Sequence, residues 1–351
     1  MGFGAFAQDF NDAKEHYNLG NDHFGEKNYD AAITEYTKAI QITPDFARAY
    51  TDRGRAHTAK GNHDSAIADH TKAIQIAPRF ATAYYNRALA YHDQKQIGPA
   101  IADYSKVIQI DPEHAMAYAN RGKAHQDNGD LDSAIADYSK TIEIDPAFAP
   151  AYASRGLIHD KQKNYSSAIV DYSKAIQINP KYAMAYYNRG NAYQARGDNE
   201  TAIADYSRAI QINPKYARAY LFRGVTYREQ KKYGMAFDDF TKVIQLEPED
   251  PVAYVARGDN FYRQADYNSA VADHSKAILL DPEYGPAYYS RGVNYGRLKK
   301  FNLAIADLTK LIQLYPESAD AYTARAEVYR ASRKIQLALA DEKKAKALSG
   351  K

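Results

Sequence analysis

The amino-acid sequence predicts an all-α fold in which pairs of antiparallel helices are stacked along the chain. Two observations lead to this prediction. Nine of the 13 prolines are spaced 34 residues apart, at positions 44, 78, 112, 146, 180, 214, 248, 282 and 316. Between these prolines, small and apolar residues recur at the three- and four-residue spacing of one helix face. A fixed period of this size indicates an array of repeated units, because a single globular core has no reason to repeat.

The repeat divides the chain into ten units without an insertion, when the recurring proline is counted as position 32. An N-terminal segment at 1–12 precedes them, and the last unit is one residue short. The predicted units are 13–46, 47–80, 81–114, 115–148, 149–182, 183–216, 217–250, 251–284, 285–318 and 319–351.

The unit at 183–216 explains why each repeat is expected to be two helices. Tyr186, Gly190 and Tyr193 lie at positions 4, 8 and 11 and predict the first helix. The polar, glycine-containing stretch at 195–199 predicts the turn. Small and apolar residues then predict the second helix, which the proline ends: Ala202, Ile203, Tyr206, Ala209 and Ile210.

This pattern resembles the tetratricopeptide repeat family over residues 13–351. The family's aromatic residue at position 4 appears as Tyr50, Tyr84 and Tyr118, and its small residue at 8, alanine at 20 and proline at 32 are also present. The resemblance implies a right-handed superhelix in which the first helix of each unit lines a concave groove. One departure is arginine at position 7, where the family usually has leucine.

Arginine occupies position 7 in nine units, and an acidic residue occupies position 23 in all ten. A partly buried arginine needs a partner, so we expect a structural ladder of arginine–acid pairs. A row of arginines that binds phosphate or carboxylate is the alternative. The first unit has Leu19 in place of the arginine and has no preceding neighbour. This favours pairing of each arginine with the acid of the unit before it.

The composition and motifs point away from catalysis. The chain has no cysteine, and it contains no phosphate-binding loop and no nucleophile-elbow serine. Five of its ten histidines fall at aromatic positions of the repeat, so we expect them to pack in the core: His57, His70, His125, His159 and His274. We therefore predict no catalytic residue, no metal site and no cofactor.

Neither a membrane span nor a nucleic-acid partner is expected. No apolar run approaches the roughly 20 residues that a transmembrane helix needs, and the net charge is only +3. Residues 5–7, Ala-Phe-Ala, have the form of a signal-peptide cleavage site. They are either the remnant of such a peptide, which would give a periplasmic or secreted protein, or a chance match in a cytoplasmic one.

Binding residues are expected on the faces of the first helices that point away from the second helices, at positions 2, 5, 6, 9, 12 and 13. In the first six units these positions are rich in asparagine. An amide side chain is both donor and acceptor, so a row of asparagines can hold a peptide backbone, although simple solvated residues are an alternative. The asparagines concerned are Asn18, Asn86, Asn120, Asn188 and Asn191.

In the seventh to ninth units the same positions become apolar or aromatic, with arginines beside them. A contiguous exposed apolar patch marks an interaction site, and arginine beside aromatic residues is common in binding hot spots. We therefore expect a protein or peptide ligand with apolar anchors and acidic flanks. Two alternatives stay open: the chain associates with itself, or it is the repeat portion of a larger enzyme or transport assembly. The residues concerned are Arg218, Leu221, Phe222, Val225, Arg228, Val252, Val255, Tyr262, Arg263, Tyr289 and Val293.

Overall fold

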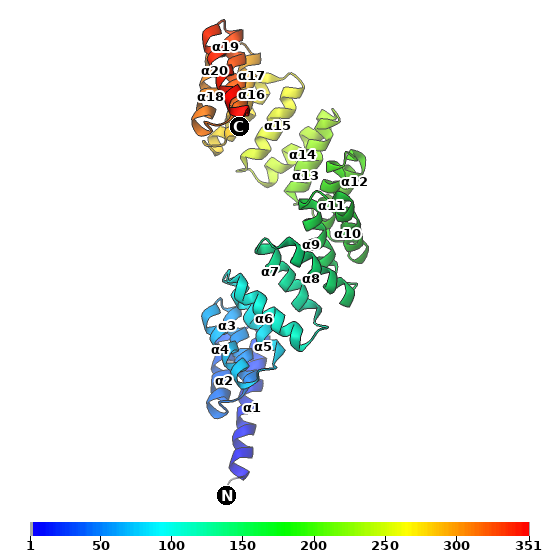
Figure 1. Cartoon of the computed structure of the whole chain (residues 1–351), viewed down its shortest axis with the longest axis vertical. Helices are drawn as coiled ribbons and strands as arrows, with labels where there is room; N and C mark the ends of the chain where they lie inside the picture. The colour runs from blue at the N-terminus through cyan, green and yellow to red at the C-terminus, as the bar shows by residue number, and fades with distance from the viewer. Residues whose placement is uncertain (1–2, 351) are drawn as a thin grey trace. The chain divides into compact units, whose positions relative to one another are not determined.

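The computed structural model describes the backbone of residues 3–350 and the side chains from Phe10 onward, and within these residues it contains helices and no strand. Figure 1 labels the helices in chain order. They are α1 (Phe3–Gly25), α2 (Tyr29–Ile42), α3 (Ala47–Ala59), α4 (His63–Ile76), α5 (Ala81–Asp93), α6 (Ile97–Ile110), α7 (Ala115–Asp127), α8 (Leu131–Ile144), α9 (Ala149–Lys161), α10 (Tyr165–Ile178), α11 (Ala183–Ala195), α12 (Asn199–Ile212), α13 (Ala217–Glu229), α14 (Tyr233–Leu246), α15 (Pro251–Arg263), α16 (Tyr267–Leu280), α17 (Gly285–Arg297), α18 (Phe301–Leu314), α19 (Ala319–Ala331) and α20 (Ile335–Ser349).

Each predicted unit folds as two helices, an odd-numbered first helix and an even-numbered second helix that run antiparallel (Figure 1). The prediction of an all-α fold built from helix pairs is therefore confirmed. The chain forms two compact parts, residues 1–179 and 180–351. We name them the N-terminal part and the C-terminal part. Each part consists of five helix pairs.

The helix ends follow from the local sequence. Before α12, the Asp198 side chain accepts a hydrogen bond from the backbone N–H of Thr201, which caps the helix start. The same helix ends at Ile212, and Pro214 stands two residues later. Because proline lacks an N–H and disfavours a helical residue before it, the recurring proline stops every second helix that precedes one.

The core of each unit depends on the small residues that the repeat supplies. Alanine at position 20, such as Ala202, is fully buried. A Cβ atom added to Gly190 at position 8 would lie only 2.7 Å from ring atom Cε1 of Tyr206. The two helices of a unit therefore approach closely, because the ring of one packs directly on the backbone of the other.

The segment at 1–12 was expected to precede the array, and the structure differs. Helix α1 begins at Phe3, so residues 3–12 extend the first helix of the first unit. The Phe10 ring lies 6.5 Å from the Phe46 ring, between centroids, so this extension already contacts the array. The side chains of the Ala-Phe-Ala stretch at 5–7 lie outside the described residues, and its origin stays a hypothesis.

The expected ladder of arginine–acid pairs is present, but the predicted partner was wrong. Arg121 donates to Asp137 of its own unit, from Nε to Oδ2 at 2.9 Å and from Nη2 to Oδ1 at 2.7 Å. The preceding unit contributes a hydroxyl instead, since Nη1 donates to Ser105 Oγ at 3.0 Å. The pairs are Arg53–Asp69, Arg87–Asp103, Arg121–Asp137, Arg155–Asp171, Arg189–Asp205, Arg223–Asp239, Arg257–Asp273, Arg291–Asp307 and Arg325–Asp341.

The geometry of the unit explains this correction. Position 7 faces the second helix of the same unit, so the acid 16 residues later is the nearest charge. In the unit at 13–46, Leu19 stands in place of the arginine, and Glu35 pairs with His16 and Lys38. Each guanidinium forms a bidentate ion pair with a buried carboxylate, so the arginines hold neighbouring helices together. They are not available as a row of side chains that binds an anion.

Candidate functional site

Two of the predicted packing histidines lie in the core. His70 and His274 are fully buried on Gly54 and Gly258 at the aromatic position of their units. Burial lowers the pKa of His70 to about 3, so this imidazole is neutral near neutral pH. In the described part of the chain, no group of three His, Asp or Glu side chains is arranged to hold a metal ion.

Two of the five candidate asparagines already have partners within the chain. Asn120 Nδ2 donates to the Tyr85 hydroxyl at 2.7 Å, and Asn191 Oδ1 accepts from the Tyr206 hydroxyl at 2.8 Å. Asn18 is exposed, and Asn86 and Asn188 are half-buried. Asn120 and Asn191 therefore help to fix tyrosine rings of the core, which a row of peptide-holding amides would not need.

The apolar wall expected in the seventh to ninth units is largely packed away. Phe222 lies edge-on to Tyr187 at 5.6 Å between ring centroids, and Val225 packs on Phe240. Leu221 joins the same core, and Val255 is only 8% exposed. The expectation of a continuous exposed wall was wrong, because positions 5, 6 and 9 fill the junctions between neighbouring units. Among these apolar and aromatic candidates only Val252 and Tyr289 are exposed, at 37% and 40%.

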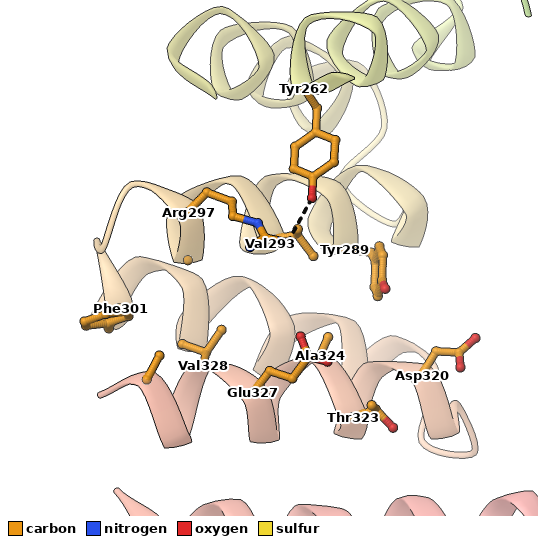
Figure 2. Close-up of a pocket in the computed structure, with 12 residues that line it drawn as sticks. Tyr262, Tyr289, Val293, Arg297, Phe301, Asp320, Thr323, Ala324, Glu327 and Val328 are labelled. Carbon is orange, nitrogen blue, oxygen red and sulfur yellow. Dashed lines mark hydrogen bonds between the residues drawn. The ribbon is translucent and has the colours of Figure 1, made fainter. Parts of the chain in front are cut away.

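Two adjoining hollows open between odd-numbered helices of the C-terminal part. The first, of about 370 Å³, lies between α15, α17 and α19 and reaches the start of α18 (Figure 2). The second, of about 290 Å³, lies between α13, α15 and α17. Both are lined by Tyr262, Tyr289 and Val293. We name the two hollows together the Tyr289 cleft.

Five of the sequence-predicted residues line this cleft: Arg228, Tyr262, Arg263, Tyr289 and Val293. The remaining candidates of this group do not line it. Arg218 is exposed elsewhere on α13, Val252 is exposed on α15, and Leu221, Phe222, Val225 and Val255 pack in the core. The sequence therefore pointed to α13, α15 and α17 but not to α19, and it did not separate core positions from cleft positions.

The first hollow combines an exposed ring with acidic side chains (Figure 2). Arg297 Nη2 donates to the Tyr262 hydroxyl at 3.4 Å, and this bond raises the pKa of Arg297. Burial raises the pKa of Tyr289, and the nearby carboxylates of Asp320 and Glu327 add to the shift. Both carboxylates are close enough to Tyr289 to affect its pKa, and both stand on α19. The hollow therefore has a negative side along α19.

The floor of the second hollow is a polar cluster. Ser290 Oγ donates to Asp259 Oδ1 at 3.1 Å, and His274 Nε2 lies 3.3 Å from the same oxygen. Asn294 Nδ2 donates to the Ser290 carbonyl at 2.7 Å. His274 thus contacts the aspartate and no described hydrogen bond joins it to Ser290, so the cluster lacks the base–hydroxyl contact that activates a serine nucleophile.

Arginines form one rim of the second hollow. Arg228 donates to the Ala256 carbonyl at 3.1 Å and lies 3.9 Å from Asp259 Oδ2. Burial lowers the pKa of Arg228, since a charge removed from water is less stable. Arg263 is exposed at the end of α15. This side of the cleft therefore carries more positive than negative charge.

The sequence analysis overlooked two buried amides, Asn260 and Asn294. They are 0% and 1% exposed, and the Oδ1 atom of each has no hydrogen-bond partner in the described residues. Both stand at position 10 of their units, which holds alanine in four other units: Ala56, Ala90, Ala124 and Ala192. That departure from the repeat was the available signal. Asp320 and Glu327 gave no comparable signal, because acidic residues are common throughout the chain.

No helix in the described part of the chain is both long enough and apolar enough to span a membrane.

Models described as tetratricopeptide repeat match residues 81–114, 115–148, 183–216, 217–250 and 286–318. A model described as TPR repeat matches 20–61, 54–95 and 161–197. Together these matches cover more than half of the chain. No curated protein matches it.

Solved structures are similar in fold. A tetratricopeptide repeat protein from Parabacteroides merdae is 20% identical with a TM-score of 0.53, over 71% of this chain and 99% of that one. The Cut9–Hcn1 hetero-tetramer of the APC/C is 15% identical with a TM-score of 0.51, over 96% of this chain and 94% of that one. Yeast Tom70 is 16% identical with a TM-score of 0.50, over 96% of this chain and 92% of that one. At these identities the likeness shows the fold alone.

Proposed function

Because the chain belongs to the tetratricopeptide repeat family, we propose that it is a non-catalytic scaffold that binds a segment of a partner protein in the Tyr289 cleft. The observation that carries this proposal is the meeting of two hollows at Tyr262, Tyr289 and Val293. A ring that is 40% exposed at such a meeting point can anchor an apolar or aromatic side chain.

The preordered side chains of this cleft support the proposal that it binds a ligand. The lining side chains stand on helices that the core and the arginine–aspartate pairs already hold in place, for example Arg257–Asp273 behind α15. A preordered wall loses little conformational entropy when a ligand is bound, so several weak contacts can add up to useful affinity. The ligand segment bears most of the ordering cost.

The test is a selection of random twelve-residue peptides on the purified full chain. We expect the wild-type chain to enrich peptides, and the variant Tyr289→Ala to lose that enrichment, because it removes the exposed ring at the meeting point of the hollows. The matched control is Leu279→Ala. Leu279 is 73% exposed on α16 and lines neither hollow, so this variant should select the same peptides as the wild type.

Equal enrichment by the Tyr289→Ala variant would indicate binding elsewhere and contradict the proposal. Phe222 and Val255 are unsuitable targets for the same experiment. Both pack in the core, so a polar residue there would disturb the fold as well as any binding. Circular dichroism of each variant checks that the helices are intact.

A further inference from the structure

The two ends of the Tyr289 cleft carry opposite charge. Arg228 and Arg263 stand at the end formed by α13 and α15, where Asp259 belongs to the floor. Asp320 and Glu327 stand at the other end, on α19. The sequence predicted a ligand with apolar anchors and acidic flanks, and the acidic residues on α19 do not favour an acidic flank at that end.

Three of these charges are available to a ligand. Arg263, Asp320 and Glu327 are exposed, and within the described residues none of them forms an ion pair. Two other charges line the cleft and keep their sign. Arg297 donates to the neutral Tyr262 hydroxyl, and Asp259 accepts from the neutral Ser290 hydroxyl. The first hollow therefore holds two acids and one arginine, and the second holds two arginines and one acid.

The middle of the cleft suits an extended side chain. The Tyr289 ring lies on α17 and faces α19, where Asp320 and Glu327 are found along the same helix (Figure 2). The face of an aromatic ring attracts a cation, and nearby carboxylates strengthen that attraction. Val293 supplies an apolar surface one helical turn further along α17.

The floor adds a hydrogen-bonding demand. Asn294 lines the second hollow, is 1% exposed, and has no donor for its Oδ1 atom within the described residues. A buried acceptor without a donor is unfavourable, because it has lost its hydrogen bonds to water. Because this oxygen is buried, an N–H group of a bound segment would reach it only if the Asn294 side chain moved.

We propose that the Tyr289 cleft binds an extended segment of a partner protein that carries both signs of charge in a fixed order. An acidic side chain of the segment pairs with Arg263 beside Arg228, and a lysine or arginine side chain lies between Asp320 and Glu327 against the Tyr289 ring. This inference rests on the proposed function and specifies its ligand. A segment with acids at both ends would be repelled at α19, so charge complementarity selects against it.

The spacing of the two charges follows from helix packing. Neighbouring helices lie roughly 8–10 Å apart, so α15 and α19, which α17 separates, are about 16–20 Å apart. An extended chain advances about 3.3 Å per residue. The acidic and basic residues of the ligand are therefore expected about five or six positions apart.

The experiment repeats the selection of random twelve-residue peptides with charge-neutral variants of the full chain. The wild type should enrich peptides with an acidic and a basic residue about five or six positions apart. The double variant Asp320→Asn/Glu327→Gln should lose only the preference for the basic residue. Arg263→Gln should lose only the preference for the acidic residue. The matched control, Asp238→Asn/Glu249→Gln, removes two exposed acids outside the cleft and should keep both preferences.

A synthetic copy of the most enriched peptide gives the second readout. By calorimetry its Kd should rise at least tenfold with the Asp320→Asn/Glu327→Gln variant and less than twofold with the control. Raising the salt from 50 mM to 500 mM should weaken wild-type binding and narrow the difference between the variants, because salt screens exposed charges.

The other outcomes are distinguishable. Enrichment of purely acidic peptides that still requires Tyr289 would overturn the two-sign inference and leave the proposed function standing. No enrichment above background would overturn both. Enriched peptides that match exposed segments of this chain, together with a dimer in light scattering, would overturn the choice of a partner protein in favour of a second copy.

Discussion

At the scale of single residues, the turn within each unit requires a left-handed backbone. Gly197 occupies this position with a φ of 85°, but Lys231 occupies it in the next unit with a φ of 60°. A side chain in this conformation is strained, and glycine is not. We predict that Lys231→Gly raises the free energy of unfolding by about 0.5–1 kcal/mol. Urea unfolding followed by circular dichroism measures the change.

The control for this prediction is Lys242→Gly, which introduces the same residue inside α14. There the backbone is helical, and glycine should lower the free energy of unfolding by about 1 kcal/mol. A loss of stability in both variants would show that the turn carries no strain.

A second residue-scale prediction concerns acid stability. Burial lowers the pKa of His70 to about 3, from the 6.5 of an exposed histidine. Between these pH values the unfolded chain binds a proton at this position and the folded chain does not, so stability falls as the pH is lowered through this range. His70→Tyr restores the ring found at this position in Tyr36 and Tyr104. We expect the variant to lose less stability between pH 7 and pH 4.5, measured by urea unfolding. An equal loss of stability in the wild type and the variant would show that His70 is not its cause.

At the scale of helices, the arginine–aspartate pair joins the two helices of one unit, and the bond from the same arginine to a hydroxyl joins that unit to the preceding one. Asp137→Ala leaves the Arg121 guanidinium half-buried without its partner, and we expect a loss of about 3 kcal/mol in the free energy of unfolding. Ser105→Ala removes a single neutral acceptor and should cost about 1 kcal/mol. Thermal unfolding of the purified variants gives both values.

A double-mutant cycle separates this pairing from the one that the sequence favoured. Coupling between Arg121 and Asp137, in the same unit, should exceed about 1 kcal/mol. Coupling between Arg121 and Asp103, the acid of the preceding unit, should stay below about 0.5 kcal/mol, because Asp103 binds Arg87. The reverse order of the two couplings would contradict the arrangement in the structure.

At the scale of the whole molecule, a stack of repeats should unfold locally. A Cβ atom on Gly224 would lie 2.8 Å from Cε1 of Phe240, so Gly224→Val overpacks the α13–α14 pair by about 1–3 kcal/mol. Each pair contacts chiefly its neighbours, so we expect faster hydrogen exchange in α11–α16 and unchanged exchange in α1–α6. The control is Gly234→Ala, whose Cβ would meet no atom within 4 Å. Faster exchange along the entire chain would indicate one cooperative unit instead.

The candidate binding cleft was predictable only in part. The change of composition in the seventh to ninth units led to Arg228, Tyr262, Arg263, Tyr289 and Val293, all of which line the cleft. It led equally to Phe222 and Val255, which are packed away. Position in a repeat tells which way a side chain leaves its helix. It does not tell whether the neighbouring unit covers that side chain.

The sequence by itself determined the helix pairs, because the 34-residue spacing of proline and the recurrence of glycine and alanine leave one way for each unit to close. Only the tertiary structure decided which acid pairs with Arg121 and which groups meet at Tyr289. The physical reason is the range of the interactions. Turns, caps and close helix contacts act within one unit and are written in its own residues. The cleft joins side chains from units that lie more than 30 residues apart, so its charges are brought together only when the units stack.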